Sequence, residues 1–326
     1  MKISDILHIT GGTLENTPHV QAVESATVFP SKVEHGDLFF AARSEDIPDA
    51  VERGAYAVVF EGERPEGLDE EIAWIRVDSV RDTAFRLLRY VLLRKEADFV
   101  LLRPHEESFL RQILTHKGNI AFLPREWTKA FEMILNSDQH LFVGSDRELM
   151  ETIRPEVERL EEEADGYMIR DTLFRSTFKV HGYIYQNKEM APFHLDYLLR
   201  VVAFCDRRDL PYSLDRVRYT RHFQPLFVDG RLESAPRGST DRVLIFVDNL
   251  DDIVKAREYV RFQSSWVKSI VLTPPGTKVE NVERPHWFST PEEAREILKS
   301  VHFNYAFIYS LDRQMLRQMR EEATLF

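Results

Sequence analysis

Ionisable side chains gather in a turn between an apolar run and an amphipathic segment near the end of the first third of the chain. Residues 99–102 form an apolar run typical of a strand, and residues 108–114 return apolar side chains at helical spacing. The turn between them contains Arg103, Pro104, His105, Glu106 and Glu107. A strand, a tight turn and a helix N-terminus often bind phosphate, because glycine lets backbone N–H groups approach and lysine neutralises the charge. This turn has neither glycine nor lysine, so it has the layout of a nucleotide site without its chemistry.

The same turn offers groups for acid–base chemistry. An imidazole beside two carboxylates supplies a general acid and a general base, so His105, Glu106 and Glu107 are candidate catalytic residues. A run of charges in a turn is more often solvated, and Arg103 beside two carboxylates favours a solvated turn over an anion site. A carboxylate repels a phosphate oxygen at about 4 Å by about 4 kcal/mol when the effective dielectric constant is about 20. We therefore expect no ATP bound here in the usual way and no other cofactor.

Composition restricts the class of protein and its partners. The 326 residues are 43% apolar and 30% charged, which is typical of a soluble globular protein with two or three domains. The net charge of -11 disfavours binding to nucleic acid or to anionic membranes. We find no secretory signal and no run of about 18 apolar residues, so we expect a cytoplasmic protein without a membrane partner. Cys205 is the single cysteine and has apolar neighbours, which indicates a buried packing residue; no metal site is expected.

Alternating strands and helices are predicted on both sides of the turn, which is typical of an α/β fold. Before the turn we expect strands near 20–28, 33–41, 55–60 and 72–77 and helices near 4–10, 46–53 and 80–94. Ser79 is the expected cap of the last helix. After the turn we expect strands at 119–123 and 139–143, helices at 126–135, 145–160 and 194–207, and an antiparallel ribbon over 172–185. The basic run 216–222 predicts a sheet edge with solvated arginines.

The last part of the chain predicts a small parallel sheet. Strands are expected at 242–248, 269–273 and 305–309, with helices over 253–262, 290–298 and from 310 to about 322. Asp248 follows the first of these strands, at the edge where open α/β sheets place ligands, although an aspartate there more often caps the next helix.

Several motifs in the first ninety residues together resemble the N-terminal domain of the Mur ligases. These motifs are Gly11-Gly12 after a helix, Val33-x-x-Gly36-Asp37-Leu38-Phe39-Phe40-Ala41, Gly54-Ala55-x-Ala57-Val58-Val59, and Val77-Asp78-Ser79 before a helix. Mur ligases are ATP-dependent enzymes that add amino acids to the UDP-muramoyl-peptide precursor of peptidoglycan. The resemblance implies an α/β fold with three domains: a Mur-ligase-like N-terminal domain (1–97), a reduced central P-loop-type domain (98–235) and a small Rossmann-like C-terminal domain (236–326).

The chain departs from this family where the family binds its substrates. If Ser108 matches the last threonine of the family's Thr-Gly-x-Asn-Gly-Lys-Thr loop, then Arg103 and Glu106 replace glycines and Glu107 replaces the lysine. Phe29-Pro30-Ser31 stands where the family has an Asp-Ser-Arg that helps to hold uridine. The family's carbamylated, magnesium-binding lysine has no counterpart that we find. The run 230–233 matches the family's Gly-Arg-x-Glu, so Arg231 joins Asp248 as a candidate ligand-binding residue.

Three functional hypotheses follow. The leading one is a degenerate Mur-ligase-like protein without ATP-dependent ligation, with a binding, regulatory or scaffolding role in cell-wall metabolism and a UDP-sugar-peptide or a cell-wall protein as partner. The second is an active enzyme with altered chemistry, either an ATP-independent ligase or a sugar-nucleotide enzyme, using His105, Glu106 and Glu107. The third is an RNA-binding module that uses Arg216, Arg218, Tyr219 and Arg221, against which the net charge argues.

Overall fold

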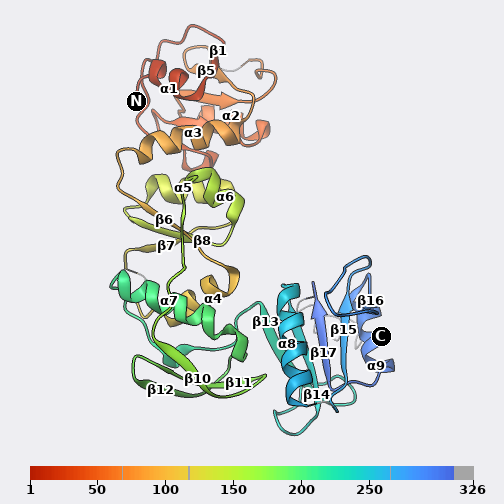
Figure 1. Ribbon diagram of the computed structural model, residues 1–326. Helices are drawn as coiled ribbons and strands as arrows, with labels where there is room; N and C mark the ends of the chain where they lie inside the picture. The colour runs from red at the N-terminus through yellow and green to blue at the C-terminus, as the bar shows by residue number, and fades with distance from the viewer. Residues whose placement is uncertain (68, 117, 265, 312–326) are drawn as a thin grey trace. The chain divides into compact units, whose positions relative to one another are not determined.

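The computed structural model describes residues 1–67, 69–116, 118–264 and 266–311 (Figure 1). The chain folds into two compact units: unit 1 comprises residues 1–102 and 117–160, and unit 2 comprises residues 103–116 and 161–326. The fold is mixed α/β with several parallel or mixed sheets, as expected from the sequence. The expected division after residues 97 and 235 stays a prediction, and the helix expected from 310 to 322 lies outside the described residues apart from its start. Within the described residues, no helix is long and apolar enough to cross a membrane.

The first sheet of unit 1 has five strands in the order β1-β5-β4-β3-β2, all parallel except β1. Its strands are β1 (Thr13–Leu14), β2 (Ala26–Thr27), β3 (Leu38–Phe40), β4 (Ala57–Phe60) and β5 (Ala73–Arg76). Its helices are α1 (Ile3–Thr10), α2 (Ile47–Glu52) and α3 (Val80–Leu92). Side chains alternate between two apolar clusters, with Phe40 and Ile75 in one and Phe39 and Trp74 in the other. Both faces are therefore covered, which explains why these strands read as continuous apolar runs.

A second, four-stranded parallel sheet completes unit 1, in the order β7-β8-β6-β9. Its strands are β6 (Asp98–Leu101), β7 (Ile120–Phe122), β8 (Leu141–Gly144) and β9 (Glu158–Arg159), and its helices are α5 (Trp127–Asn136) and α6 (Arg147–Ile153). The helix expected over 145–160 is shorter in the structure at both ends, since α6 begins at Arg147 and ends at Ile153. Asp146 caps α6 by accepting from the N–H of Leu149, and the helix stops early because Pro155 disfavours helical backbone at Arg154.

Unit 2 begins with two helices and an antiparallel ribbon. These are α4 (Pro104–Ile113), α7 (Leu195–Arg207) and the strands β10 (Gly166–Thr172), β11 (Arg175–Val180) and β12 (Tyr183–Lys188), with 3-10 turns at Pro192–His194 and Leu214–Arg216. The ribbon confirms the expectation for 172–185. The basic run 216–222 does not form the expected sheet edge. Arg216 and Arg218 instead donate to backbone carbonyls, so these side chains fix a loop in place.

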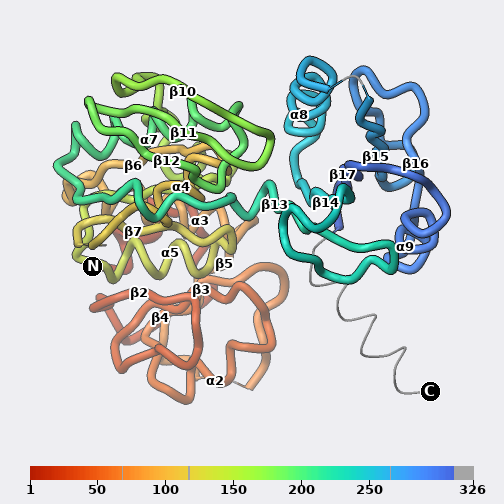
Figure 2. The backbone as a smooth tube through the Cα atoms, turned by 90° about the horizontal axis from the view of Figure 1, so that it is seen from below, coloured from red at the N-terminus to blue at the C-terminus, as the bar shows by residue number. Residues whose placement is uncertain are grey.

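The remaining sheet of unit 2 has five strands in the order β13-β14-β17-β15-β16. They are β13 (Phe223–Val228), β14 (Arg242–Val247), β15 (Ser269–Thr273), β16 (His286–Trp287) and β17 (Tyr305–Tyr309). The three expected strands, β14, β15 and β17, pair in parallel as predicted, whereas β13, which was not expected, pairs antiparallel with β14. Helices α8 (Leu250–Gln263) and α9 (Pro291–Ser300) pack on opposite faces, with Ile253 of α8 and Leu298 of α9 in different apolar clusters (Figure 2).

Candidate functional site

Three ionisable side chains of the turn are buried, contrary to the sequence-based expectation of a solvated turn, while Arg103 is exposed. Helix α4 already starts at Pro104, so the charged residues belong to its first turn rather than to a loop. The exposed fractions are 2% for His105, 1% for Glu106 and 5% for Glu107. These polar side chains are buried because α4 packs along α7 within unit 2. Each of them therefore needs a partner inside the protein.

The three side chains find separate partners. Glu106 folds back, and its Oε2 accepts a hydrogen bond of 2.7 Å from the backbone N–H of Arg103. Glu107 accepts from Nε of Arg111 at 2.8 Å. His105 contacts Thr220 and Asp252. The contacts of these three candidate catalytic residues do not converge on one reacting position.

The pKa of the Glu106 carboxyl group is raised above its ordinary value. Burial raises the pKa of its carboxyl group, and the hydrogen bond from Arg103 and the charges of Arg103 and Arg200 offset part of that rise. The guanidinium nitrogens of Arg103 and Arg200 lie 3.9 and 3.7 Å from Oε1. Among the described residues, Oε1 has no hydrogen-bond partner. The helix N-terminus thus holds a buried carboxylate of its own.

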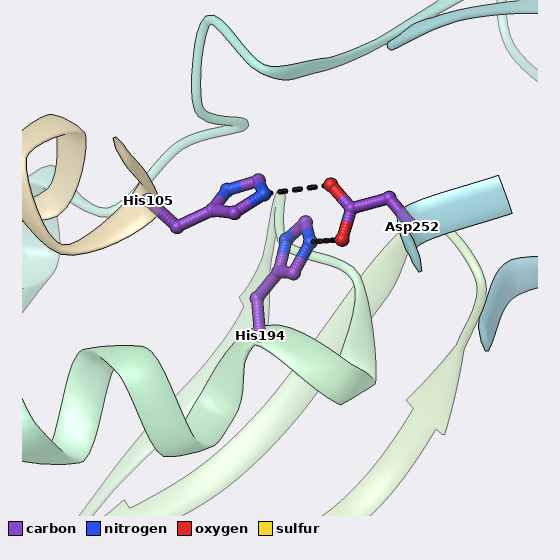
Figure 3. A group of neighbouring side chains, drawn as sticks. All are labelled: His105, His194 and Asp252. Carbon is purple, nitrogen blue, oxygen red and sulfur yellow. Dashed lines mark hydrogen bonds and ion pairs between the residues drawn. The ribbon is translucent and has the colours of Figure 1, made fainter. Parts of the chain in front are cut away.

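Two histidines and one aspartate from three different elements meet beside this turn (Figure 3). His105 lies in the first turn of α4, His194 immediately precedes α7, and Asp252 lies in the first turn of α8. Nε2 of His105 is 2.6 Å from Oδ2 of Asp252, and Nε2 of His194 is 3.2 Å from Oδ1 of the same carboxylate. The two imidazole centroids are 4.1 Å apart, and all three side chains are at most 2% exposed. We call these residues the His-Asp cluster.

The His-Asp cluster is held by an outer layer of polar and aromatic groups. Nδ1 of His105 is 2.9 Å from Oγ1 of Thr220, and the ring of Tyr197 stacks on that of His105 at a centroid distance of 5.2 Å. His222, with its ring 5.3 Å from that of His105, hydrogen-bonds Asp248 through Nδ1. Asp248 is therefore not the cap of α8. Asn249 takes that role by accepting from the N–H of Asp251.

The pKa values of two side chains in the His-Asp cluster, Asp252 and His194, are shifted from their ordinary values. Burial alone would raise the pKa of Asp252, but hydrogen bonds from His105 and His194 lower it below its ordinary value. Burial lowers the pKa of His194 to about 4, against a smaller raising effect of its hydrogen bond to Asp252. His194 is therefore neutral and Asp252 is ionised at pH 7.

The contacts of His105 follow the order of a nucleophile, a base and an acid: Thr220, His105, Asp252. Such an arrangement activates a hydroxyl when a substrate can reach it. Thr220 is 0% exposed, and His105 and Asp252 are 2% and 0% exposed. No substrate reaches a hydroxyl that is buried in this way, so the geometry favours holding a proton or an ion over nucleophilic catalysis.

The other sequence candidates lie elsewhere. Arg231 is exposed in the link between β13 and β14, where its N–H donates to Asp229. Asp248 has a side chain that is 57% exposed and is engaged by His222. Cys205 is buried as expected, and burial raises the pKa of its thiol to about 12. A thiol with that pKa is not a nucleophile at neutral pH.

Unit 1 contains a polar cavity of about 570 Å³. It lies where β4 and β5 end and α3 begins, the edge at which open α/β sheets bind ligands. Its lining includes Gly11, Val77, Asp78 and Ser79, which belong to the motifs that resemble the Mur ligases. Acidic and basic groups are mixed in it, because Glu61 and Asp82 accompany Arg76 and Arg86.

Sequence patterns alone did not identify the His-Asp cluster. His105 was a candidate for a different chemistry, His194 was the first residue of an expected helix, and Asp252 immediately preceded another expected helix. Their positions are 147 residues apart at the extremes and share no motif. The one available signal was that each stands at the beginning of a helix beside apolar residues, a pattern that many surface polar residues share.

Comparison with known proteins places the fold. No protein-family model and no curated protein sequence matches the chain. Among solved structures, it is similar to the MurF ligase from Thermotoga maritima in complex with ADP, with 13% identity and a TM-score of 0.55 over 92% of this chain and 97% of that one. It is also similar to MurF from Acinetobacter baumannii, with 14% identity and a TM-score of 0.52 over 99% of this chain and 98% of that one. The chain has a Mur-ligase-like fold.

Proposed function

We propose that this protein has a binding, regulatory or scaffolding role linked to peptidoglycan precursor metabolism and does not carry out ATP-dependent ligation. The proposal rests on one observation, the state of the α4 N-terminus. The N–H of Arg103 is bonded to the carboxylate of Glu106, and the next residue, Pro104, has no N–H to offer. Glu106 and Glu107 are both buried there. A phosphate group would have to displace the carboxylate of Glu106.

Physical chemistry supports the proposal that this arrangement disfavours a phosphate. A helix N-terminus attracts anions because its first N–H groups lack partners and the helix dipole is positive there. In α4 the side chain of Glu106 already occupies that position. Repulsion of about 4 kcal/mol between a carboxylate and a phosphate oxygen at about 4 Å is a large share of the roughly 8 kcal/mol that a micromolar affinity represents.

The N-terminal sheet supports the binding part of the proposal. Its cavity of about 570 Å³ lies at the carboxyl ends of β4 and β5 and is lined by exposed polar groups. The volume falls in the range of about 300 to 1,000 Å³ that is usual for small-molecule sites. We propose that a UDP-muramoyl-peptide or a related precursor contacts the protein here, with Arg86 as its cationic contact.

Calorimetric titration of the full chain with UDP-muramoyl-peptide tests this assignment. We expect saturable binding that weakens at least about tenfold in Arg86→Ala, since a charge-assisted hydrogen bond contributes about 1.5–3 kcal/mol. Arg81→Ala is the matched control, because Arg81 lies on the same helix, pairs with Glu148 and does not line the cavity. If the wild type does not bind UDP-muramoyl-peptide, or if Arg86→Ala binds it as tightly as the wild type does, the proposed precursor site is contradicted.

A ligation assay tests the loss of activity. The protein is incubated with UDP-muramoyl-peptide, Mg-ATP and amino acids, and phosphate release and product mass are measured. We expect neither phosphate nor an extended peptide. A product with one more amino acid, formed at the expense of ATP, would overturn the proposed loss of ligation.

A further inference from the structure

We propose that the His-Asp cluster, His105, His194 and Asp252, is a binding site for a divalent transition-metal ion, with zinc as the preferred ion. The first argument is convergence. Each residue offers one ligand atom, and these atoms all lie within 4.8 Å of one another although they come from three separate elements. Both imidazoles direct Nε2 at the same carboxylate (Figure 3).

The donor set determines the class of ion. Two imidazole nitrogens and one carboxylate suit zinc and ferrous iron, whereas magnesium and calcium prefer an all-oxygen shell. A tetrahedral zinc ion with bonds of about 2.1 Å places neighbouring donors about 3.4 Å apart. His194 and Asp252 already have 3.2 Å between donor atoms, while His105 and Asp252 are 2.6 Å apart and would separate by about 0.8 Å. A small side-chain rotation achieves that change.

Buried charge is the second argument. Asp252 is 0% exposed, and within the described part of the chain its ion-pair partners are the two histidines, with no lysine or arginine among them. A buried carboxylate without a lysine or arginine partner is costly, because hydrogen bonds from two imidazoles replace only part of its lost hydration. A divalent cation between the three side chains compensates that charge.

The contacts that His105 makes outside the His-Asp cluster are the third argument. A metal-binding imidazole usually engages a polar group through its second nitrogen, which fixes the ring and leaves a lone pair for the metal. Nδ1 of His105 has such a partner in Thr220, whose Oγ1 can accept a hydrogen bond from Nδ1–H when Nε2 binds a metal. Tyr197 stacks on the same ring and restricts its rotation.

Such an ion would join α4, the start of α7 and α8 inside unit 2. The ion would therefore cross-link the segment that corresponds to the family's ATP loop to the first helix of the C-terminal sheet. This inference stands separately from the proposed function, because metal content is measured without any precursor or ligation assay.

Metal analysis of the intact protein is the direct experiment. The chain is produced with zinc in the medium, since the cluster is buried and loading is expected during folding, and zinc per chain is measured after gel filtration. We expect about one equivalent of zinc per chain in the wild type. A competition titration with a zinc chelator is expected to show at least about 100-fold weaker zinc binding in His194→Ala and Asp252→Asn. Absence of stoichiometric zinc in the wild type would overturn the proposed site. A zinc affinity in both variants equal to that of the wild type would also overturn it.

A matched control separates a metal site from an ordinary histidine–aspartate contact. His181 and Asp206 of unit 2 make the same kind of contact, with 2.8 Å between Nε2 and Oδ2, but they are about 40% exposed. His181→Ala is expected to keep wild-type zinc content and affinity. Loss of zinc in this variant would assign the ion to the surface and overturn the proposal.

A measurement on the wild type alone covers the case in which the variants do not fold. Protein refolded from urea with cobalt in place of zinc is expected to show the intense ligand-field absorption of a four-coordinate ion, and saturating zinc is expected to raise the melting temperature by about 5–10 °C. A six-coordinate cobalt spectrum together with an unchanged melting temperature would overturn the proposal.

Discussion

Two strand-to-helix turns of this chain share a local layout and have opposite accessibility. In the first, β5 leads into α3, where Ser79 caps the helix by accepting from the N–H of Asp82, and the exposed Asp78 borders a cavity of about 570 Å³. In the second, β6 leads into α4, where His105 and Glu106 are buried. The first turn keeps room for a ligand, while side chains of the protein fill the second.

The difference lies in where the partners of each turn come from. The polar contacts of Ser79 stay within its own turn, since Asp82 is three residues away. Those of His105 reach Thr220 and Asp252, which are 115 and 147 residues away. The open turn is thus held by residues nearby in the sequence, the N–H of Val80 donating to Glu61 only 19 residues away, whereas the filled turn depends on the folding of the rest of unit 2. Variants in the two regions test this comparison.

The largest expected effect belongs to the filled turn. Asp252→Ala removes the carboxylate that Nε2 of both buried imidazoles, His105 and His194, contacts, so we expect a loss of about 3–5 kcal/mol in the free energy of unfolding of unit 2. Urea unfolding followed by circular dichroism measures it. His181→Ala, at an exposed pair, is expected to cost less than about 1 kcal/mol. Equal small losses in both variants would mean that burial of the cluster contributes no stability.

A smaller effect is expected at the open turn. Ser79→Ala removes the side chain that caps α3, and loss of such a cap costs about 1 kcal/mol. Ser79→Asp is expected to keep the cap and most of the stability. Chemical unfolding of the two variants under the same conditions gives the difference. A loss in Ser79→Ala as large as that in Asp252→Ala would contradict the distinction between a locally and a globally specified turn.

Glu106 gives a pH-dependent prediction. Its folded-state pKa is raised above 4.5, so the native state binds more protons than the unfolded state between that pH and the raised pKa. The contribution of this carboxyl group to stability therefore declines as pH rises through that window. Glu106→Gln keeps an acceptor for the N–H of Arg103 but does not titrate. We expect wild-type stability, relative to Glu106→Gln, to fall as pH rises from 4.5, and a rise would contradict a buried carboxyl group.

The smallest effect is expected at Cys205. Its thiol is buried with a pKa raised to about 12, so an alkylating reagent at pH 8 is expected to leave it unmodified in the native protein. Mass spectrometry measures the modification, with urea-unfolded protein as the reactive control. Rapid alkylation of the native protein would show that the helix α7 opens readily.

Local patterns predict much of the fold and little of the candidate site. Strands 269–273 and 305–309 coincide with β15 and β17, and Ser79 caps α3 as expected, because apolar runs and helix caps act within a few residues. The antiparallel pairing of β13 was missed, since it depends on a partner strand rather than on its own sequence. The burial of His105 and Glu106 was missed for the same reason: charge in a turn is solvated unless distant elements supply partners.

Titration of the full chain with Mg-ATP by calorimetry tests the central claim most directly. The MurF ligase from Thermotoga maritima, whose structure contains ADP, is a suitable positive control. With the carboxylate of Glu106 buried and bonded to the N–H of Arg103, we predict no saturable heat up to millimolar ATP. Saturable binding with a micromolar Kd would contradict the account, because it would show that the α4 N-terminus, or another site in the chain, still accepts a nucleotide.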